Sequence, residues 1–343
     1  MHKIHLVLFC LLSIFIISGC HSSGQKPPDV SHIVISSVHI QRFDREFMQI
    51  DSNHVLQGLS QLNEKYPVFM PVYLENIMNF GPFSDTSSIL RIEVHSFITA
   101  IDVQRLQDTI DKHFPSMTKY EKELQQGFRY IKYYFPAFRP PNIVTFESGL
   151  ANYGAITADS VLGIGLDMFL GPDFIPYTKV SNPYPDYMLR QFSAEFIPAD
   201  CFKVIEQQMF PLSQSGTLLD QMVAYGKQLH FLDKVMPYAP DSIKTGFTQF
   251  QLNWCKKNEQ YIWQYFVQNN LLYTHDMQKI LHYIGPGPNT RGMPAVSPGN
   301  IGSWVGWQIV RKYMNEHPGT TLAQLMHLDN SQQLLSEARY NPH

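Results

Sequence analysis

The sequence has 343 residues, of which 44% are hydrophobic and 13% aromatic, and it carries a formal net charge of −3 at pH 7. This apolar content is enough for one large domain or for two closely packed ones. Proteins that bind nucleic acid usually present a basic stripe, so we expect no nucleic-acid partner.

The N-terminus has the pattern of an exported lipoprotein. Lys3 precedes an apolar run over residues 6–17, which is too short to span a membrane as a stable helix. A Ser-Gly pair stands directly before Cys20 and resembles the lipobox at which bacterial lipoproteins are cleaved and acylated on the new N-terminal cysteine. We therefore expect residues 1–19 to be a signal peptide; the alternative is an ordinary export signal with a chance cysteine.

The lipidated cysteine would anchor the protein without any membrane-spanning helix. A triacylated Cys20 exceeds the two signals that stable anchoring needs, so membrane lipid is the expected partner of this end. Residues 20–30 are polar and contain proline, as in a tether, and residues 31–343 are expected to form one domain. No later apolar run approaches membrane-spanning length.

The first elements of this domain are a strand and a helix. Alternating apolar residues over 32–44 predict a strand. Apolar spacing that begins at Val55 predicts a helix, and Pro67 and Pro71 are expected to break it.

Two amphipathic helices follow. The first begins with Asp102 as a plausible N-cap. The second covers residues 118–135 and stops at Pro136. We expect the apolar stripes of both helices to form core.

The β part is short. Residues 143–146 predict a strand, and residues 153–167 predict a hairpin that turns at Asp159 and Ser160. A loop rich in proline and aromatic residues leads to a predicted helix within residues 184–202. Everything beyond Leu218 predicts further helices, so the expected fold class is α+β, predominantly helical, with a small embedded β-sheet.

Cys201 and Cys255 are the thiols that remain once the signal peptide is removed and Cys20 is lipidated. In an exported protein they could form a disulfide. Buried free cysteines are also common, and the spacing in the sequence leaves both possibilities open.

A series of stretches along the chain carries a family resemblance. In order, they read YFPAFRPPNIVTFESGL, IGLDMFLG, YGKQLHFLDKVMP, NEQYIW, LLYTHD and SPGNIGSWVGWQIVRKYM, ending in SEARYNP. Together with the lipobox they resemble the GldB-type gliding-motility lipoproteins of the Bacteroidetes over nearly the whole chain. The resemblance implies an outer-membrane lipoprotein needed for gliding over surfaces, although members also occur in bacteria that do not glide.

The same strand and helix are more distantly similar to predicted zinc proteases of the zincin type. In that group the helix carries H-E-x-x-H, which places two imidazoles around a metal on one helix face. The corresponding helix here contains no histidine and offers Gln191 and Glu195 at that spacing, with Pro198 interrupting it soon after. An amide and a carboxylate match zinc poorly, so we expect a zincin-like domain without metal, cofactor or catalytic residues.

Other catalytic patterns are absent from the sequence. There is no H-x-x-x-H, and His275 and His282 would lie ~10 Å apart along a helix. No G-x-S-x-G occurs, and the segment around Ser148 lacks the pattern of a nucleophile elbow. The glycine-containing segments match no nucleotide-binding motif. Paired acidic residues are plentiful but uninformative, because Asp and Glu scattered along helices usually face solvent.

An aromatic and polar group near the C-terminus is the remaining candidate site. Trp254, Tyr261 and Tyr265 are expected along one helical face. The candidate binding residues are Asn258, Glu259, Trp263, Arg291, Trp304 and Trp307. One interpretation is a packed core with a few satisfied polar groups; the other is a pocket for an envelope partner or a glycan, because aromatic anchors dominate recognition.

These observations lead to one leading hypothesis. The protein is expected to be a non-catalytic lipoprotein of the outer membrane that acts through envelope protein partners in gliding or envelope machinery. It is expected to face the periplasm, because surface-exported lipoproteins of this bacterial group carry acidic residues soon after the lipidated cysteine, and here none precedes Asp29. The alternatives are a cryptic metallopeptidase or other hydrolase, and a nutrient-binding lipoprotein of the glycan-uptake kind.

The anchor can be tested by Cys20→Ala. This variant should stay uncleaved or behave as an ordinary soluble export, because no other residue supplies the acyl attachment. Fractionation of membranes after a high-salt wash measures the outcome. Retention of the variant in the washed membranes would contradict the lipobox interpretation.

Overall fold

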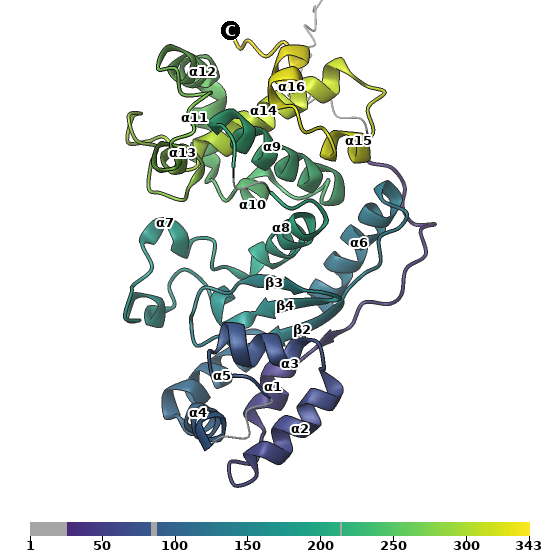
Figure 1. Cartoon of the computed structure of the whole chain (residues 1–343), viewed down its shortest axis with the longest axis vertical. Helices are drawn as coiled ribbons and strands as arrows, with labels where there is room; N and C mark the ends of the chain where they lie inside the picture. The colour runs from purple at the N-terminus through teal and green to yellow at the C-terminus, as the bar shows by residue number, and fades with distance from the viewer. Residues whose placement is uncertain (1–25, 84–87, 213–214) are drawn as a thin grey trace, which may run out of the picture.

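The computed structural model describes residues 26–83, 88–212 and 215–343, and it shows a small sheet between two layers of helices (Figure 1). The strands are β1 (Ile40–Gln41), β2 (Asn142–Phe146), β3 (Ala155–Ala158) and β4 (Val161–Gly165). They stand in the order β1-β2-β4-β3, with β3 antiparallel to β4 and the other pairs parallel. The predicted α+β class, dominated by helix, is confirmed.

The sheet separates two hydrophobic cores. Along β4, Leu162 and Ile164 belong to the larger core, whereas Val161 belongs to the smaller one. On β2, Val144 and Phe146 contribute to the smaller core as well. Since successive side chains of a strand point to opposite faces, both faces of the two central strands are covered.

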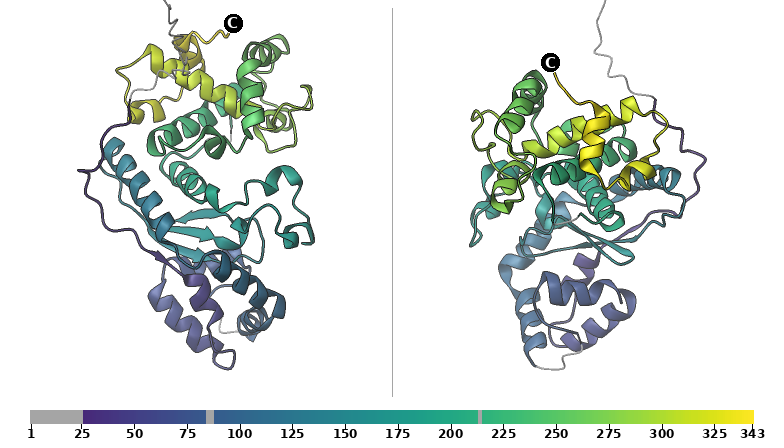
Figure 2. Two further views of the ribbon diagram at one scale, coloured as in Figure 1. Left: turned by 180° about the vertical axis from the view of Figure 1, so that it is seen from behind. Right: turned by 45° about the horizontal axis from the view of Figure 1, so that its top comes forward.

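The helices between β1 and β2 form most of the layer drawn below the sheet in Figure 1, except for the last of them, whose buried residues belong to the larger core on the other face. They are α1 (Phe43–Met48), α2 (Val55–Lys65), α3 (Phe69–Pro71), the π-helical η1 (Val72–Ile77), α4 (Ser88–Thr99), α5 (Ile101–His113) and α6 (Thr118–Tyr134). The two views in Figure 2 show this layer and the C-terminal helices on opposite sides of the sheet.

The elements after the sheet begin with short helical turns and continue as longer helices. They are η2 (Leu166–Phe169), η3 (Ile175–Thr178), α7 (Asp186–Leu189), η4 (Ala194–Phe196), α8 (Ile197–Met209), α9 (Leu218–Val235), α10 (Asp241–Thr245), α11 (Gln249–Lys257), α12 (Glu259–Gln268), α13 (Met277–Ile284), α14 (Ile301–Glu316), α15 (Leu322–Met326) and α16 (Ser331–Ala338).

Several predicted elements are confirmed. The amphipathic helix before Pro136 is α6, which ends at Tyr134. The predicted hairpin is β3 and β4, and Asp159 adopts the positive φ of 48° that its turn requires. Pro67 follows directly after α2 and its C-cap residue, as expected.

The predicted strand over residues 32–44 is mostly wrong. Only Ile40 and Gln41 pair with β2, and α1 begins at Phe43. The preceding segment runs as coil beside α6 in both Figure 1 and Figure 2. Val30 and Val38 are buried there, so packing of these side chains explains the apolar alternation without a sheet partner.

Two other local predictions are also corrected. Pro71 does not end a helix; it lies in the first turn of α3, where its missing N–H is tolerated, and the chain continues as η1. Asp102 is not an N-cap, because α5 begins at Ile101 and Ala100 occupies the cap position. The carboxylate of Asp102 lies in the first turn, where it complements the helix dipole.

The predicted helix within residues 184–202 is discontinuous. The chain leaves α7 at Leu189 and becomes α-helical again only at Ile197. Pro198 therefore lies in the first turn of α8 instead of interrupting a helix. Gln191 and Glu195 do not face each other across one helical turn, since residues 190–193 are not helical.

The closest helix contact of the C-terminal layer joins α9 and α14. A Cβ added to Gly226 would collide with the backbone of Gly306, and one added to Gly306 would collide with the carbonyl of Met222. Trp304 and Trp307 of α14 are fully buried in this layer. Two glycines thus bring the helices together closely enough to enclose two indole rings.

A partly buried ion-pair network connects the same two helices. Asp233 of α9 accepts hydrogen bonds from Trp307 Nε1 at 2.8 Å and Arg311 Nε at 2.9 Å, and it pairs with Lys244 Nζ at 2.9 Å. The guanidinium of Arg311 also stacks over the Trp307 ring. Burial acts to raise the pKa of Asp233, but Arg311 and Lys244 hold it below its usual range.

The structure also shows the state of the two cysteines and whether its helices could span a membrane. Cys201 and Cys255 are free, buried thiols. None of the helices within residues 26–83, 88–212 and 215–343 combines the length and the apolar character needed to cross a bilayer. Cys20 and the signal peptide lie outside the described residues.

The α9–α14 contact predicts a specific stability effect. Gly306→Ala should lower the free energy of unfolding by about 1–3 kcal/mol, because the helices must separate to admit the methyl group. Denaturant unfolding of the purified protein measures this. Gly319→Ala is the matched control, since a Cβ there meets nothing within 4 Å. Equal stability of the two variants would show that the contact can relax at no cost.

Candidate functional site

A cleft of about 310 Å³ lies beside the outer edge of the sheet. Ala155 of β3 lines one side, and Asp200, Lys203 and Gln207 of α8 line the other. Met168, Phe169, Met188 and Phe192 supply apolar lining. The cleft therefore combines an apolar interior with a polar rim, which is the usual composition of a binding site.

The strand beside this cleft is an edge strand. β3 pairs with β4, and no strand among the described residues pairs with its other side. Gly165 donates its N–H to the carbonyl of Gly154, so hydrogen-bonded pairs continue at every second residue along the ladder. The backbone groups of Ala155 and Thr157 are therefore directed away from β4. Such groups can pair with an extended peptide.

A strained loop forms one end of the cleft. Within residues 147–154, Gly149, Leu150 and Asn152 all have positive φ, between 63° and 67°. For a bulky side chain such as Leu150 this conformation is unfavourable and persists only where the surroundings impose it. Asn152 and Gly154 line the cleft, so the strained loop shapes its wall.

A buried aspartate imposes this loop conformation. Asp167 Oδ2 accepts hydrogen bonds from Ser148 N at 3.0 Å, Ser148 Oγ at 2.8 Å and Leu150 N at 2.7 Å. Tyr184 donates to the carbonyl of Leu150 at 2.6 Å, and Tyr177 donates to that of Asp167 at 2.7 Å. Burial raises the pKa of Asp167 to about 6, although the donors to Oδ2 act against this rise.

Glu147 stands beside this aspartate and is equally buried. Glu147 directly follows β2, and Asp167 follows β4 after one intervening residue. Because β2 and β4 are parallel neighbours, both carboxyl groups lie at the carboxyl ends of adjacent strands. The side chain of Glu147 has no hydrogen-bond partner at either oxygen. Burial, followed by repulsion from Asp167 and Asp44, raises its pKa to about 9.

The signal for this carboxyl pair in the sequence is the position of both acids at the ends of predicted strands. Glu147 comes directly after a predicted strand, and Asp167 is the last residue of the predicted hairpin, but only the structure shows that these two strands pair in parallel and bring their carboxyl ends together. Treating the paired acids as uninformative therefore missed Glu147 and Asp167, which are 1% and 0% exposed.

The helix wall of the cleft carries charges that pair with each other. Lys203 Nζ lies 3.1 Å from Asp200 Oδ1 across one helical turn of α8. Gln191 also lines the cleft, whereas Glu195 is exposed on η4. Within the residues that the structure describes, no group of three or more His, Cys, Asp or Glu side chains is placed to hold a metal.

The predicted aromatic site is divided by the structure. Trp304 and Trp307 are core residues between α9 and α14. Arg291 is exposed in the loop before α14, where Nη1 lies 3.4 Å from Nε2 of His282. These three residues therefore do not form one pocket with the others.

The remaining candidates lie around the start of α12. Glu259 Oε1 accepts a hydrogen bond from Tyr340 at 2.8 Å, and the ring of Tyr340 packs edge-on against Trp263 at 5.1 Å. Asn258 donates to the carbonyl of Trp254 at the junction of α11 and α12. Because the helix is interrupted there, the expected single face of Trp254, Tyr261 and Tyr265 is wrong.

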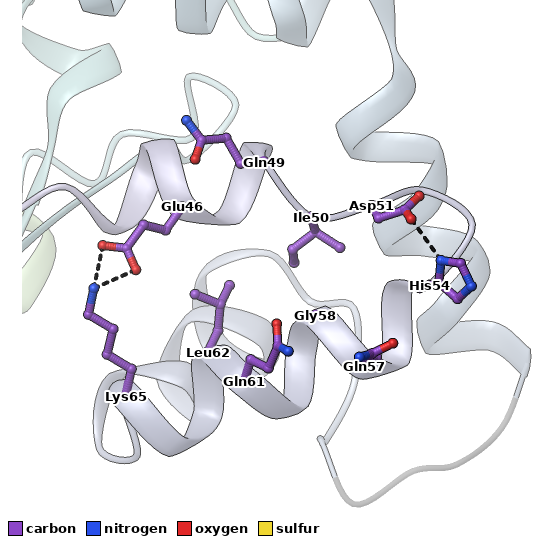
Figure 3. A pocket seen from close by; sticks show the side chains of 10 residues that line it. All are labelled: Glu46, Gln49, Ile50, Asp51, His54, Gln57, Gly58, Gln61, Leu62 and Lys65. Atoms are coloured by element: carbon purple, nitrogen blue, oxygen red, sulfur yellow. Dashed lines mark hydrogen bonds and ion pairs between the residues drawn. The ribbon is translucent and has the colours of Figure 1, made fainter.

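A second hollow, of about 490 Å³, lies between α1 and α2 (Figure 3). Two carboxylates, a lysine and a histidine of its lining form two pairs. Lys65 Nζ lies 2.7 Å from both oxygens of Glu46, and His54 Nδ1 lies 2.7 Å from Asp51 Oδ2. These groups pair with each other, as Asp200 and Lys203 do in the cleft beside β3, but no edge strand among the described residues lines the hollow.

The chain matches a known protein family over nearly its whole length. Residues 23–342 match the family described as "Gliding motility protein GldB". The chain belongs to this family. No curated protein and no solved structure gives a significant match. The predicted GldB resemblance is confirmed, and the more distant similarity to zincin-type proteases stays a prediction.

Proposed function

We propose that this GldB family member is a non-catalytic outer-membrane lipoprotein that binds a protein partner of the gliding or envelope machinery through the cleft beside β3. Acylation of Cys20 would hold it in the membrane, with the folded part facing the periplasm. Family membership supports the connection to gliding motility and to a lipoprotein of the cell envelope.

The edge of β3 is the observation that carries the partner-binding proposal. An extended segment placed along β3 would pair with the outward backbone groups of Ala155 and Thr157. Its side chains would meet the apolar residues Met168 and Phe192 on one side and the α8 rim on the other. Main-chain pairing would supply affinity, and the cleft lining would supply specificity.

Filling the cleft tests this proposal. Gln207 is an exposed residue of α8 that lines the cleft, so Gln207→Trp should obstruct it without disturbing the core. We expect the amount of partner recovered from cross-linked membranes to fall by about tenfold or more, equivalent to a loss of ~1.4 kcal/mol in binding. Motility of a gliding strain that lacks its own family member should not be restored by this variant.

The matched control is Gln332→Trp, which makes the same change at an exposed position of α16 away from the cleft. It should restore motility and recover the partner as the unmodified protein does. If Gln207→Trp accumulated normally and restored motility fully, the cleft would not be the partner site.

The proposal that the protein is non-catalytic predicts that it holds no zinc. Purified protein should hold no stoichiometric zinc, and Glu195→Gln should leave its biological role intact, because Glu195 is exposed and lies outside the cleft. Elemental analysis and a peptidase assay check this. About one zinc per chain, lost on Glu195 substitution together with peptidase activity, would favour the cryptic metallopeptidase.

A further inference from the structure

The carboxyl groups of Glu147 and Asp167 form a buried acidic pair with unused acceptors. Both oxygens of Glu147 and Oδ1 of Asp167 have no hydrogen-bond partner. The two side chains are 1% and 0% exposed, so water does not solvate them from outside. A buried carboxylate without partners is among the costliest groups in a protein and requires neutralisation.

In the part of the chain that the structure describes, the charged side chains that act on Glu147 are negative. Asp44 of α1 and Asp102 of α5 both act on Glu147 as negative neighbours. Arg42 is occupied, since its guanidinium pairs with Asp44 at 2.6 Å and with Asp111 at 2.8 Å. Among the described residues, no lysine, arginine or histidine forms an ion pair with either carboxyl group of the pair.

The nearby hydroxyl groups donate to atoms other than the three unpaired carboxyl oxygens. Tyr73 of η1 donates to the backbone carbonyl of Glu147 at 2.9 Å, and Tyr177 of η3 donates to that of Asp167. Ser148 donates to Asp167 Oδ2. Neutralisation must therefore come from a species bound by the pair itself, either a proton or a metal cation.

The surroundings favour the proton. Hard cations such as Ca²⁺ take six to eight oxygen ligands, and Mg²⁺ usually keeps several waters. Here Asp167 Oδ2 already accepts three hydrogen bonds, and the described residues provide no group of three metal-ligating side chains. A proton needs neither additional ligands nor additional space.

We propose that Glu147 and Asp167 form a proton-binding site that holds one proton at neutral pH and thereby stabilises the strained wall of the cleft. Asp167 remains ionised, because three donors converge on its Oδ2, and Glu147 is neutral. Loss of the proton from Glu147 would add a second negative charge next to the ionised Asp167, whose carboxylate accepts the hydrogen bonds from Ser148 and Leu150. These hydrogen bonds hold the loop of residues 148–152, so it is the part that this repulsion loosens.

The direction of the pH dependence follows from the raised pKa values. The folded protein binds a proton at Glu147 more tightly than the unfolded chain does, since the pKa rises from 4.5 to about 9 on folding. The stabilisation is therefore complete below pH 4.5 and declines as the pH rises towards 9. Asp167 contributes in the same direction between pH 3.8 and about 6.

The experiment compares full-length protein in detergent with Glu147→Gln, which keeps the shape of the side chain and removes its titration. We expect the Tm of the unmodified protein to fall between pH 6 and 9, and the variant to melt at least about 2 °C higher than it at pH 9. Glu195→Gln, which removes the same charge from an exposed position, should follow the unmodified protein.

Two further measurements keep the proposal testable if Glu147→Gln folds poorly. The infrared spectrum of the unmodified protein at pH 7 should contain a buried protonated carboxyl band that disappears above pH 9. Amide exchange at residues 148–152, corrected for intrinsic rates, should increase over the same range. Absence of that band at pH 7 would overturn the proposal, and so would a rise in Tm on adding Ca²⁺ or Mg²⁺ that Glu147→Gln abolishes, because the pair would then be a metal site.

Discussion

The structure depends on a narrow sheet that is covered on both faces. β2 and β4 are the central strands, and each contributes side chains to both hydrophobic cores, one on each face of the sheet. The segments that follow the carboxyl ends of these strands therefore enter the protein interior instead of the solvent. Polar residues placed there must find partners within the fold, and Asp167 does so by binding the backbone of the neighbouring loop.

That constraint also explains why the candidate site was hard to predict from sequence. The hairpin of β3 and β4 and the helix α6 follow from local periodicity and a turn signal, and both are confirmed. The burial of Glu147 follows from the parallel pairing of β2 with β4, which sets Phe146 opposite Gly165, and from helices that cover both faces. Local patterns carry no information on such pairings, so an acid after a strand resembles any surface acid.

The wrong predictions share a second physical cause. Proline is compatible with the first turn of a helix as well as with its end, and apolar alternation is compatible with packed coil as well as with a strand. Pro198 and Pro71 stand in the first turn of a helix, where proline is tolerated, instead of ending one. Buried residues of the coil beside α6 alternate as a strand does, although packing alone explains them. Tertiary contacts decide between such alternatives.

The two walls of the cleft are held by independent parts of the fold. On one wall, Asp167 and Tyr184 fix residues 148–152 in a conformation that the chain does not favour on its own. Gly165 permits the loop to approach, since a Cβ there would collide with the carbonyl of Tyr153. On the other wall, α8 is anchored through buried residues such as Phe202. A cleft whose walls are set before binding lets a ligand bind without ordering the site, which reduces the entropic cost of association.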